Sequence, residues 1–137
     1  MRSAVKGQPT SNELSEIGYF YTMHELSLAA EVIKLVESEA VKHNARSVDE
    51  ITIEVGDFSG VQAEAFRSAL EILSENSGIR DARINIERKK GKGICPACSQ
   101  EFEMEQRIDR CPACGEFPSE IISGYEFRVV SLTIEND

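Results

Sequence analysis

The sequence has no tryptophan, only two histidines, and four cysteines that all lie between positions 95 and 114. Aromatic residues make up 7% of the chain, so its hydrophobic core must be mainly aliphatic. No apolar run reaches the roughly 18–20 residues that a transmembrane helix needs, and residues 1–22 lack the continuous apolar region of a secretory signal. These absences predict a cytoplasmic protein without a membrane partner, in which the cysteines stay reduced.

Basic residues are also scarce. The chain has 24 acidic and 15 basic residues and a net charge of −9 at pH 7, whereas general nucleic-acid binding requires a basic surface. We interpret its basic cluster, residues 88–92 (RKKGK), as the solvated end of a strand. We therefore expect no nucleic-acid partner. We also find no Ser/His/Asp or Cys/His arrangement that would indicate a catalytic nucleophile, so we do not expect an enzyme.

The four cysteines form two matched pairs. Cys95-Pro-Ala-Cys98 is followed, after twelve residues, by Cys111-Pro-Ala-Cys114-Gly. Each Cys-x-x-Cys turn directs two thiolates at one point, and two such turns complete the closed tetrahedral site that is typical of structural zinc. Two disulfides would need an oxidising compartment, and redox chemistry normally uses one pair. The pattern predicts a four-cysteine zinc site, with a rubredoxin-like iron site as the alternative.

Hydrophobic periodicity predicts two helices and three strands. The helices are expected at residues 23–43 and 62–76, the first with an apolar stripe that includes Leu26. The strands are expected at residues 51–55, 82–88 and 125–135. The first two strands are joined through a helix, so we expect them to be parallel with a right-handed crossover. The strands before and after the cysteine module are expected to pair antiparallel, with the module at the tip of a long hairpin.

The last predicted strand changes phase along its length. Phe127 and Val129 belong to one face, whereas Leu132 and Ile134 belong to the opposite phase. Side chains of a strand alternate with a period of two, so we expect a bulge or bend near residues 129–130. The fold class that follows is α+β: a small three-stranded sheet covered by two helices, with an inserted four-cysteine zinc-ribbon module.

The chain divides into three parts on this basis. Residues 1–22 are polar and irregular and are expected to form a flexible N-terminal extension. Residues 23–91, completed by the strand at 125–137, would form an α/β domain. Residues 92–124 would form the zinc-binding module, whose apolar candidates are Ile94, Phe102, Met104 and Ile108.

The two histidines have different contexts. His43 lies at a predicted helix end, where a cation favours the helix dipole, and we interpret it as a surface residue. His24 lies between Met23 and Glu25 at a helix start, where helix capping competes with a ligand role. If Met23 is the first residue, its α-amine, the amide and imidazole nitrogens of His24, and the Glu25 amide can form a planar set of four nitrogens. Such sets select Ni(II) or Cu(II) over zinc.

The segment Met-His-Glu-Leu-Ser at residues 23–27, together with the Cys-Pro-x-Cys module between two strands, resembles the HypA/HybF family. These are nickel metallochaperones for the maturation of [NiFe] hydrogenase and, in some bacteria, of urease. The resemblance runs from Met23 to about Glu135. It includes the turn after the first strand, residues 54–61 (EVGDFSGV), and the closing segment, residues 130–135 (VSLTIE).

The resemblance implies a metal carrier rather than a catalyst. Met23, His24 and Glu25 would bind Ni(II) as transported cargo, and the four cysteines would hold structural Zn(II). The implied partners are a GTPase accessory protein of hydrogenase maturation, the hydrogenase large-subunit precursor, urease accessory proteins and a second copy of the chain. The alternative function is a zinc-ribbon module that binds protein or nucleic acid and has no nickel role.

Two features depart from the family pattern. Twenty-two residues precede Met23, so the nitrogen of Met23 in this chain is an amide. Either translation or processing exposes Met23, which we favour, or nickel binds through the His24 imidazole, the Glu25 carboxylate and waters. In addition, Gln62 occupies a turn position where relatives can carry an acidic residue, which argues against a further ligand there.

Overall fold

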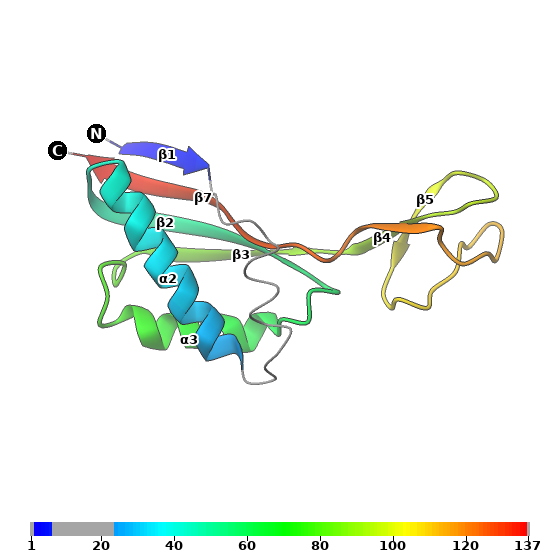
Figure 1. The fold of residues 1–137 in the computed structure, drawn as a ribbon, viewed down its shortest axis with the longest axis horizontal. Helices are drawn as coiled ribbons and strands as arrows, with labels where there is room; N and C mark the ends of the chain where they lie inside the picture. The colour runs from blue at the N-terminus through cyan, green and yellow to red at the C-terminus, as the bar shows by residue number, and fades with distance from the viewer. Residues whose placement is uncertain (1, 7–23, 137) are drawn as a thin grey trace.

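The computed structural model describes residues 2–6 and 24–136, with only the backbone defined for residues 2–6 and His24. Figure 1 shows an elongated molecule. A four-stranded sheet lies at one end with α2 (His24–Lys42) and α3 (Ala63–Ser74), and a smaller three-stranded sheet lies at the other end with the cysteine loops. This arrangement confirms the expected α+β class with an inserted cysteine module.

The larger sheet contains the three expected strands and one more. Its order is β1-β7-β2-β3, where β1 is Arg2–Lys6, β2 is Ala45–Gly56, β3 is Arg83–Lys89 and β7 is Phe127–Asn136. β2 runs parallel to β3, as predicted, and antiparallel to β7. β1 was not expected, because its sequence has no core pattern. It adds at the β7 edge, where backbone pairing alone can hold a five-residue strand.

The predicted pairing of the strands on either side of the module is wrong. β2 lies between β3 and β7, so these two strands do not pair with each other. The reason is that β2 is 12 residues long and buries Ile51, Ile53 and Val55, which favours the central position with a neighbour on each side. The antiparallel pair forms inside the module, between β4 (Gly91–Ile94) and β6 (Glu120–Ser123).

The predicted bulge in the last strand is confirmed. Thr52 of β2 faces Ser131, but the next residue, Ile53, faces Val129, so Val130 is skipped in the register. The extra residue at the bulge shifts the inward–outward alternation of side chains in the second half of β7 by one position. The apolar residues on both sides of it therefore reach the same core, and Phe127, Val129, Leu132 and Ile134 are all buried.

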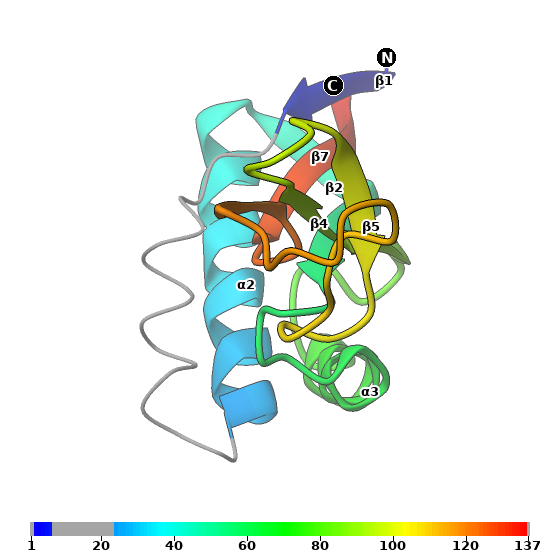
Figure 2. The ribbon, with the colours of Figure 1, turned by 90° about the vertical axis from the view of Figure 1, so that its right-hand side faces the viewer.

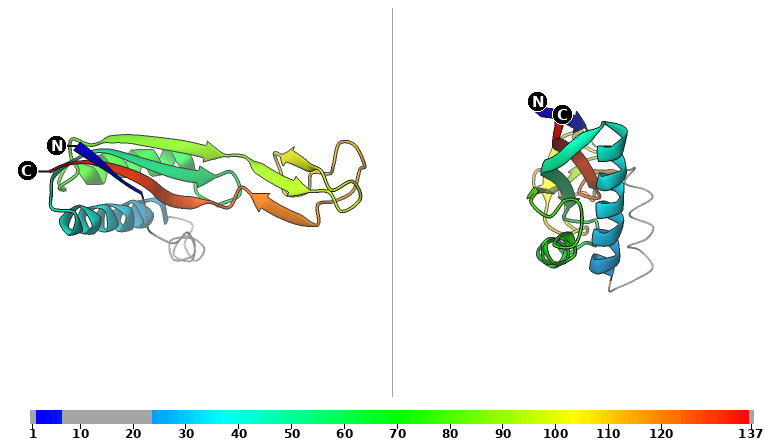
Figure 3. Two further views of the ribbon diagram at one scale, coloured as in Figure 1. Left: turned by 90° about the horizontal axis from the view of Figure 1, so that it is seen from above. Right: turned by 90° about the vertical axis from the view of Figure 1, so that its left-hand side faces the viewer.

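α2 and α3 cover one face of the larger sheet, as Figures 2 and 3 show. The buried stripe of α2 is centred on Leu28, Val32 and Val36. Leu26 was expected in this stripe but is 52% exposed, because it lies two residues before Leu28, about 200° around the helix axis. In α3, Phe66 packs edge-on against Phe127 of β7, with ring centroids 5.1 Å apart.

α2 ends where the sequence indicated. Asn44 adopts the left-handed conformation, with φ of 54°, and its amide bonds to the carbonyl of Val41 at 3.1 Å. His43 lies on the surface at this end, with its Nε2 atom 3.8 Å from the Glu39 carboxylate. The described residues contain no helix that is both long and apolar enough to cross a membrane.

The smaller sheet carries the cysteine module. β4 is its central strand, between β5 (Glu101–Met104) and β6. Phe102 and Met104 are buried, but Ile108 is 71% exposed and does not contribute to the module core. Its place is taken by Phe58, which comes from the turn between β2 and α3 and clusters with these two residues and with Cys95 and Cys111.

Candidate metal centre

The two cysteine pairs lie in backbone turns of the same form. In the first, the amide of Ser99 bonds to the carbonyl of Cys95 at 2.9 Å, and the amide of Cys95 bonds to the carbonyl of Gln100 at 3.0 Å. The second repeats this pattern, with Gly115 N–H to Cys111 O at 2.8 Å and Cys111 N–H to Glu116 O at 2.9 Å. Ser99 and Gly115 both have positive φ, 61° and 72°. The repeated sequence thus gives two matched turns that present their sulfurs to each other.

The sulfur positions fit a tetrahedral metal ion. All four Sγ atoms lie within 4.8 Å of one another. The Sγ atoms of Cys98 and Cys111 are 3.8 Å apart, and sulfurs bound at ~2.3 Å to one tetrahedral zinc ion are expected about 3.8 Å apart. Within the described ranges, no other group of three or more histidine, cysteine or carboxylate side chains converges in this way. The donor set therefore fits structural zinc.

Two of the thiols have shifted pKa values. Hydrogen bonds from the backbone amides of Cys98 and Ala97 lower the pKa of Cys95 to about 7, although burial opposes this shift. Hydrogen bonding with the side chain of Cys98, together with burial, raises the pKa of Cys114 to about 12. Because the pKa of Cys114 is raised, a metal ion that binds all four sulfurs must displace the proton of Cys114.

The predicted nickel residues lie at the start of α2. Met23 and the side chain of His24 lie outside the described part of the structure, and the backbone of His24 forms the first residue of the helix. The carboxylate of Glu25 accepts a hydrogen bond from the backbone amide of Gln62 at 3.2 Å. Gln62 is the N-cap residue of α3, so this bond joins the N-terminal ends of the two helices. This hydrogen bond links residues that are 37 positions apart in the chain, so no local sequence pattern predicts it.

Three basic residues of the cluster at positions 88–92 pair with carboxylates. Arg88 pairs with Asp57 at 2.9 Å, Lys89 with the largely buried Glu54 at 3.4 Å, and Lys90 with Glu103 at 3.3 Å. These ion pairs support the interpretation of the cluster as a solvated strand end, because the positive charges are matched locally.

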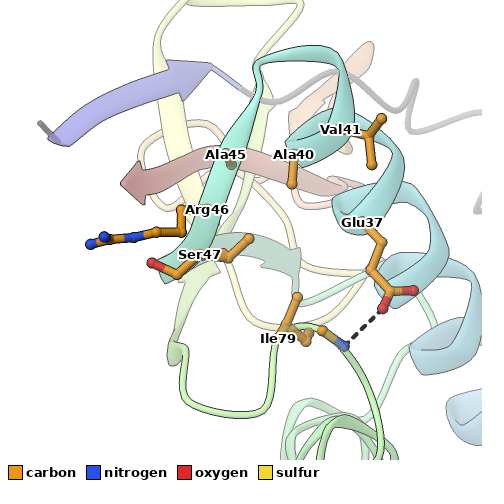
Figure 4. Close-up of a pocket in the computed structure, with 9 residues that line it drawn as sticks. Glu37, Ala40, Val41, Ala45, Arg46, Ser47 and Ile79 are labelled. Atoms are coloured by element: carbon orange, nitrogen blue, oxygen red, sulfur yellow. Dashed lines mark hydrogen bonds between the residues drawn. The ribbon is translucent and has the colours of Figure 1, made fainter. Parts of the chain in front are cut away.

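A shallow pocket of about 220 Å³ lies at the other end of α2, between that helix, the start of β2 and the loop before β3 (Figure 4). Its walls include Ala40, Val41 and Ile79. The carboxylate of Glu37 accepts a hydrogen bond from the Gly78 amide at 2.9 Å. The pocket contains no group of three or more metal-ligating side chains among the described residues.

The fold and the cysteine cluster define a small α+β protein with a four-cysteine group that could hold a metal ion on an inserted module. The family model described as "Hydrogenase/urease nickel incorporation, metallochaperone, hypA" matches residues 23–134. The chain belongs to this HypA family. The match begins at Met23, so β1 lies before the part of the chain that the family model covers.

Individual relatives agree with this assignment. The hydrogenase maturation factor HypA of Geobacter metallireducens is 37% identical over 113 residues, which cover 82% of this chain and all of the relative. The protein of the same name from Parabacteroides distasonis is 36% identical over 115 residues, which cover 84% of this chain and all of that relative. The solution structure of the Ni metallochaperone HypA from Helicobacter pylori has a TM-score of 0.58 and 28% identity, and covers 82% of this chain and 98% of that one.

Proposed function

We propose that this chain binds Ni(II) at Met23, His24 and Glu25 and delivers it for the maturation of [NiFe] hydrogenase, while its four cysteines hold a structural zinc ion. The observation that carries the proposal is the family match, which starts at Met23, the residue where the nitrogen chelate would start. The family description, nickel incorporation for hydrogenase and urease, gives the class of cargo and of client enzyme.

The helix start supports a chelate made of main-chain nitrogens. The first four amides of an α-helix have no acceptor within the helix, and His24 and Glu25 are the first two residues of α2. Their nitrogens can therefore serve a metal ion without breaking a helical hydrogen bond. The Glu25 carboxylate accepts the Gln62 amide, which favours the main-chain nitrogen of Glu25 over its carboxylate as the ligand.

Zinc would have a structural role. Cys95, Cys98, Cys111 and Cys114 would be its four ligands, which leaves no open position for a substrate. When bound, zinc would stabilise loops whose own hydrophobic core is small, namely Phe58, Phe102 and Met104 with the two buried cysteines. The module would then be a rigid support, and nickel would be the ion that moves.

As a carrier, the protein would act in the cytoplasm with other maturation proteins. The partners we propose are a GTPase accessory protein of the same pathway and the hydrogenase large-subunit precursor, with urease accessory proteins as further clients and a homodimer as a further assembly. No catalytic residues are assigned, because reversible metal binding needs neither a nucleophile nor an acid–base pair.

The histidine can be tested with a matched pair of variants. His24→Gln should abolish stoichiometric nickel binding at micromolar concentrations, while one zinc per chain and the fold are retained. His43→Gln changes the other histidine, at the opposite end of α2, and should leave nickel binding unchanged. Isothermal titration and metal analysis measure both. Retention of stoichiometric nickel by the His24→Gln chain would refute the assignment.

The role of the amine can be tested by comparing chains that start at Met1 and at Met23. The shorter chain should bind Ni(II) more tightly, and its affinity should rise with pH as the amine loses its proton, with an ordinary pKa of about 7.7–8.0. Equal affinities and equal absorption spectra would remove the amine from the mechanism and leave the His24 imidazole with the Glu25 carboxylate.

A further inference from the structure

The four cysteines differ in how well solvent reaches their sulfurs. Cys95 and Cys111 are buried, with 0% and 3% of their surfaces exposed, whereas Cys98 is half-buried and Cys114 is exposed. A zinc ion would hold all four as thiolates, the form of cysteine that reacts with oxidants and other electrophiles. Access to the sulfur therefore decides which cysteine reacts first, and Cys114 is the most accessible of the four.

The backbone around Cys114 is also open to solvent. Residues 112–117, which include most of the second cysteine turn, are all exposed. A Cβ atom at Gly115 would meet nothing within 4 Å apart from the adjoining residues. A small oxidant such as hydrogen peroxide can therefore reach the sulfur of Cys114 without a change in the fold.

The sulfur best placed to combine with an oxidised Cys114 is that of Cys98, in the other turn. The Sγ atoms lie within 4.8 Å of one another, and a disulfide bond is about 2.05 Å long, so the two sulfurs have to approach by less than about 3 Å. Cys95 and Cys111 belong to the core of the module with Phe58, whereas Cys98 only packs against that core. Cys98 and Cys114 can therefore turn towards each other with the least loss of packing.

We propose that Cys114 is a site of reversible oxidation by hydroperoxides, and that its oxidation ends in a disulfide with Cys98 that joins the two cysteine turns. In the first step, the Cys114 thiolate attacks hydrogen peroxide, so that the O–O bond breaks, a sulfenic acid forms and hydroxide leaves. In the second step, the Cys98 thiolate attacks the sulfenic sulfur, and a second hydroxide leaves as the disulfide forms. The two sulfurs together lose two electrons, which reduce the peroxide.

Zinc binding would be lost as a result of this oxidation. The oxidised site offers two thiolates in place of four, too few for the closed tetrahedral site of structural zinc. Because the disulfide spans the two turns, their sulfurs stay together, and a thiol reductant can restore the four-cysteine site. The loss of zinc rests on the zinc site proposed above, whereas the disulfide requires only the two cysteines and the oxidant.

Peptide mapping of the full, zinc-loaded chain tests the disulfide. The protein is treated with hydrogen peroxide, its free thiols are alkylated, and it is digested with trypsin. The first cysteine pair lies in the tryptic peptide 93–107 and the second in the peptide 111–128. We expect these peptides to be linked through Cys98 and Cys114, with Cys95 and Cys111 alkylated. Unlinked peptides, or a link through another pair of sulfurs, would overturn the proposal.

The order of reaction and its reversal are measured on the same chain. A limiting amount of N-ethylmaleimide should label Cys114 at least about tenfold faster than Cys95 or Cys111, in line with their exposure. Peroxide should release one zinc per chain, which a chromophoric chelator detects, and excess dithiothreitol should restore zinc binding. Faster labelling of a buried cysteine, or zinc that stays bound in excess peroxide, would contradict the proposal. A chain that holds no zinc before treatment would refute the zinc site instead, and its peptide map would still decide whether the disulfide forms.

Two histidine variants provide a matched pair. Cys114→His and Cys111→His each leave three cysteines and one imidazole, a ligand set that zinc accepts. Cys111→His keeps both sulfurs of the proposed disulfide and should still give linked peptides after peroxide treatment. Cys114→His lacks the exposed sulfur and should lose the linked product entirely, so linked peptides from this variant would count against the proposal. If either variant fails to fold, the map of the unaltered chain decides.

Discussion

Gly91 and Gly124 form the narrow junction between the two sheets. A Cβ atom at Gly91 would lie 2.2 Å from Cε2 of Phe58, and one at Gly124 would lie 2.8 Å from Cδ2 of the same ring. The Phe58 ring therefore lies against backbone on both connecting segments, at a distance that only glycine permits. These contacts explain why an aromatic residue of the main domain can complete the core of the module.

Gly91→Ala should therefore destabilise the zinc-loaded chain by about 2–3 kcal/mol, as overpacking of a filled core does. Gly115→Ala is the control: a Cβ atom there meets no neighbour within 4 Å, and only the positive φ of 72° opposes it, so about 1 kcal/mol is expected. Urea unfolding measures both values. A loss at Gly91 no greater than that at Gly115 would show that the Phe58 ring moves aside freely.

At this scale the sequence predicted the convergence of the four cysteines better than the contacts around them. The spacing of the four cysteines was sufficient to predict a shared site, because each pair is a local turn. The contact of Phe58 with Cys95 and Cys111, and that of Glu25 with Gln62, join residues that are distant in the chain. Such contacts depend on how the helices and strands pack together, so the local periodicity of the sequence does not predict them.

Among the elements, β1 is the one in the larger sheet that the sequence did not predict. It pairs with the outer edge of β7 over five residues, from Arg2 opposite Glu135 to Lys6 opposite Ser131. Without β1, this edge of β7 would present unpaired backbone groups to solvent. The N-terminal extension therefore carries a strand that covers the edge, in addition to lengthening the chain before Met23.

Deletion of residues 1–22 should speed amide exchange in the part of β7 that faces β1, residues 131–135, by about tenfold or more, because an uncovered edge opens at little cost. Amides that join β2 to β3 should keep their protection and provide an internal control. Exchange mass spectrometry or NMR measures both regions in one experiment. If residues 131–135 are equally protected in both chains, β1 does not cover this edge in solution.

The other strands of the larger sheet show which features of a strand can be predicted from the sequence. The bulge at Val130 was predictable, because a change of phase within one strand is a local signal. The separation of β3 from β7 by β2 was not, because periodicity identifies a strand but does not say which strand takes the centre of the sheet. Burial of Ile51, Ile53 and Val55 across a 12-residue strand decided that point.

The stability of the whole molecule should depend on pH through the cysteine site. A zinc ion would bind the cysteines as thiolates, so its binding would release protons, and the stabilisation that it gives would be lost as pH falls. In the metal-free chain the pKa of Cys114 is raised to about 12 and that of Cys95 is lowered to about 7. Near neutral pH, zinc must therefore always displace the proton of Cys114, and below pH 7 increasingly that of Cys95 as well.

Zinc affinity should thus fall by at least about tenfold per pH unit as pH decreases from about 8, and more steeply below about 7, since each displaced proton contributes one power of ten. Competition with a chromophoric chelator between about pH 6 and 8 measures the slope, and the thermal unfolding midpoint of the loaded chain should decrease in parallel. An affinity that does not change across this range would mean that the sulfurs are already deprotonated before the metal arrives.

The antiparallel pairing of β1 with β7 also brings the beginning and the end of the described chain to the same end of the sheet, away from the module (Figure 1). A short linker could therefore join the two ends, and the chain could be reopened between Thr22 and Met23. Such a circular permutant would retain β1 and yet begin with a free methionine amine. The N-terminal extension adds β1 to the sheet and also converts the nitrogen of Met23 from an amine to an amide. The circular permutant would separate these two effects within one polypeptide.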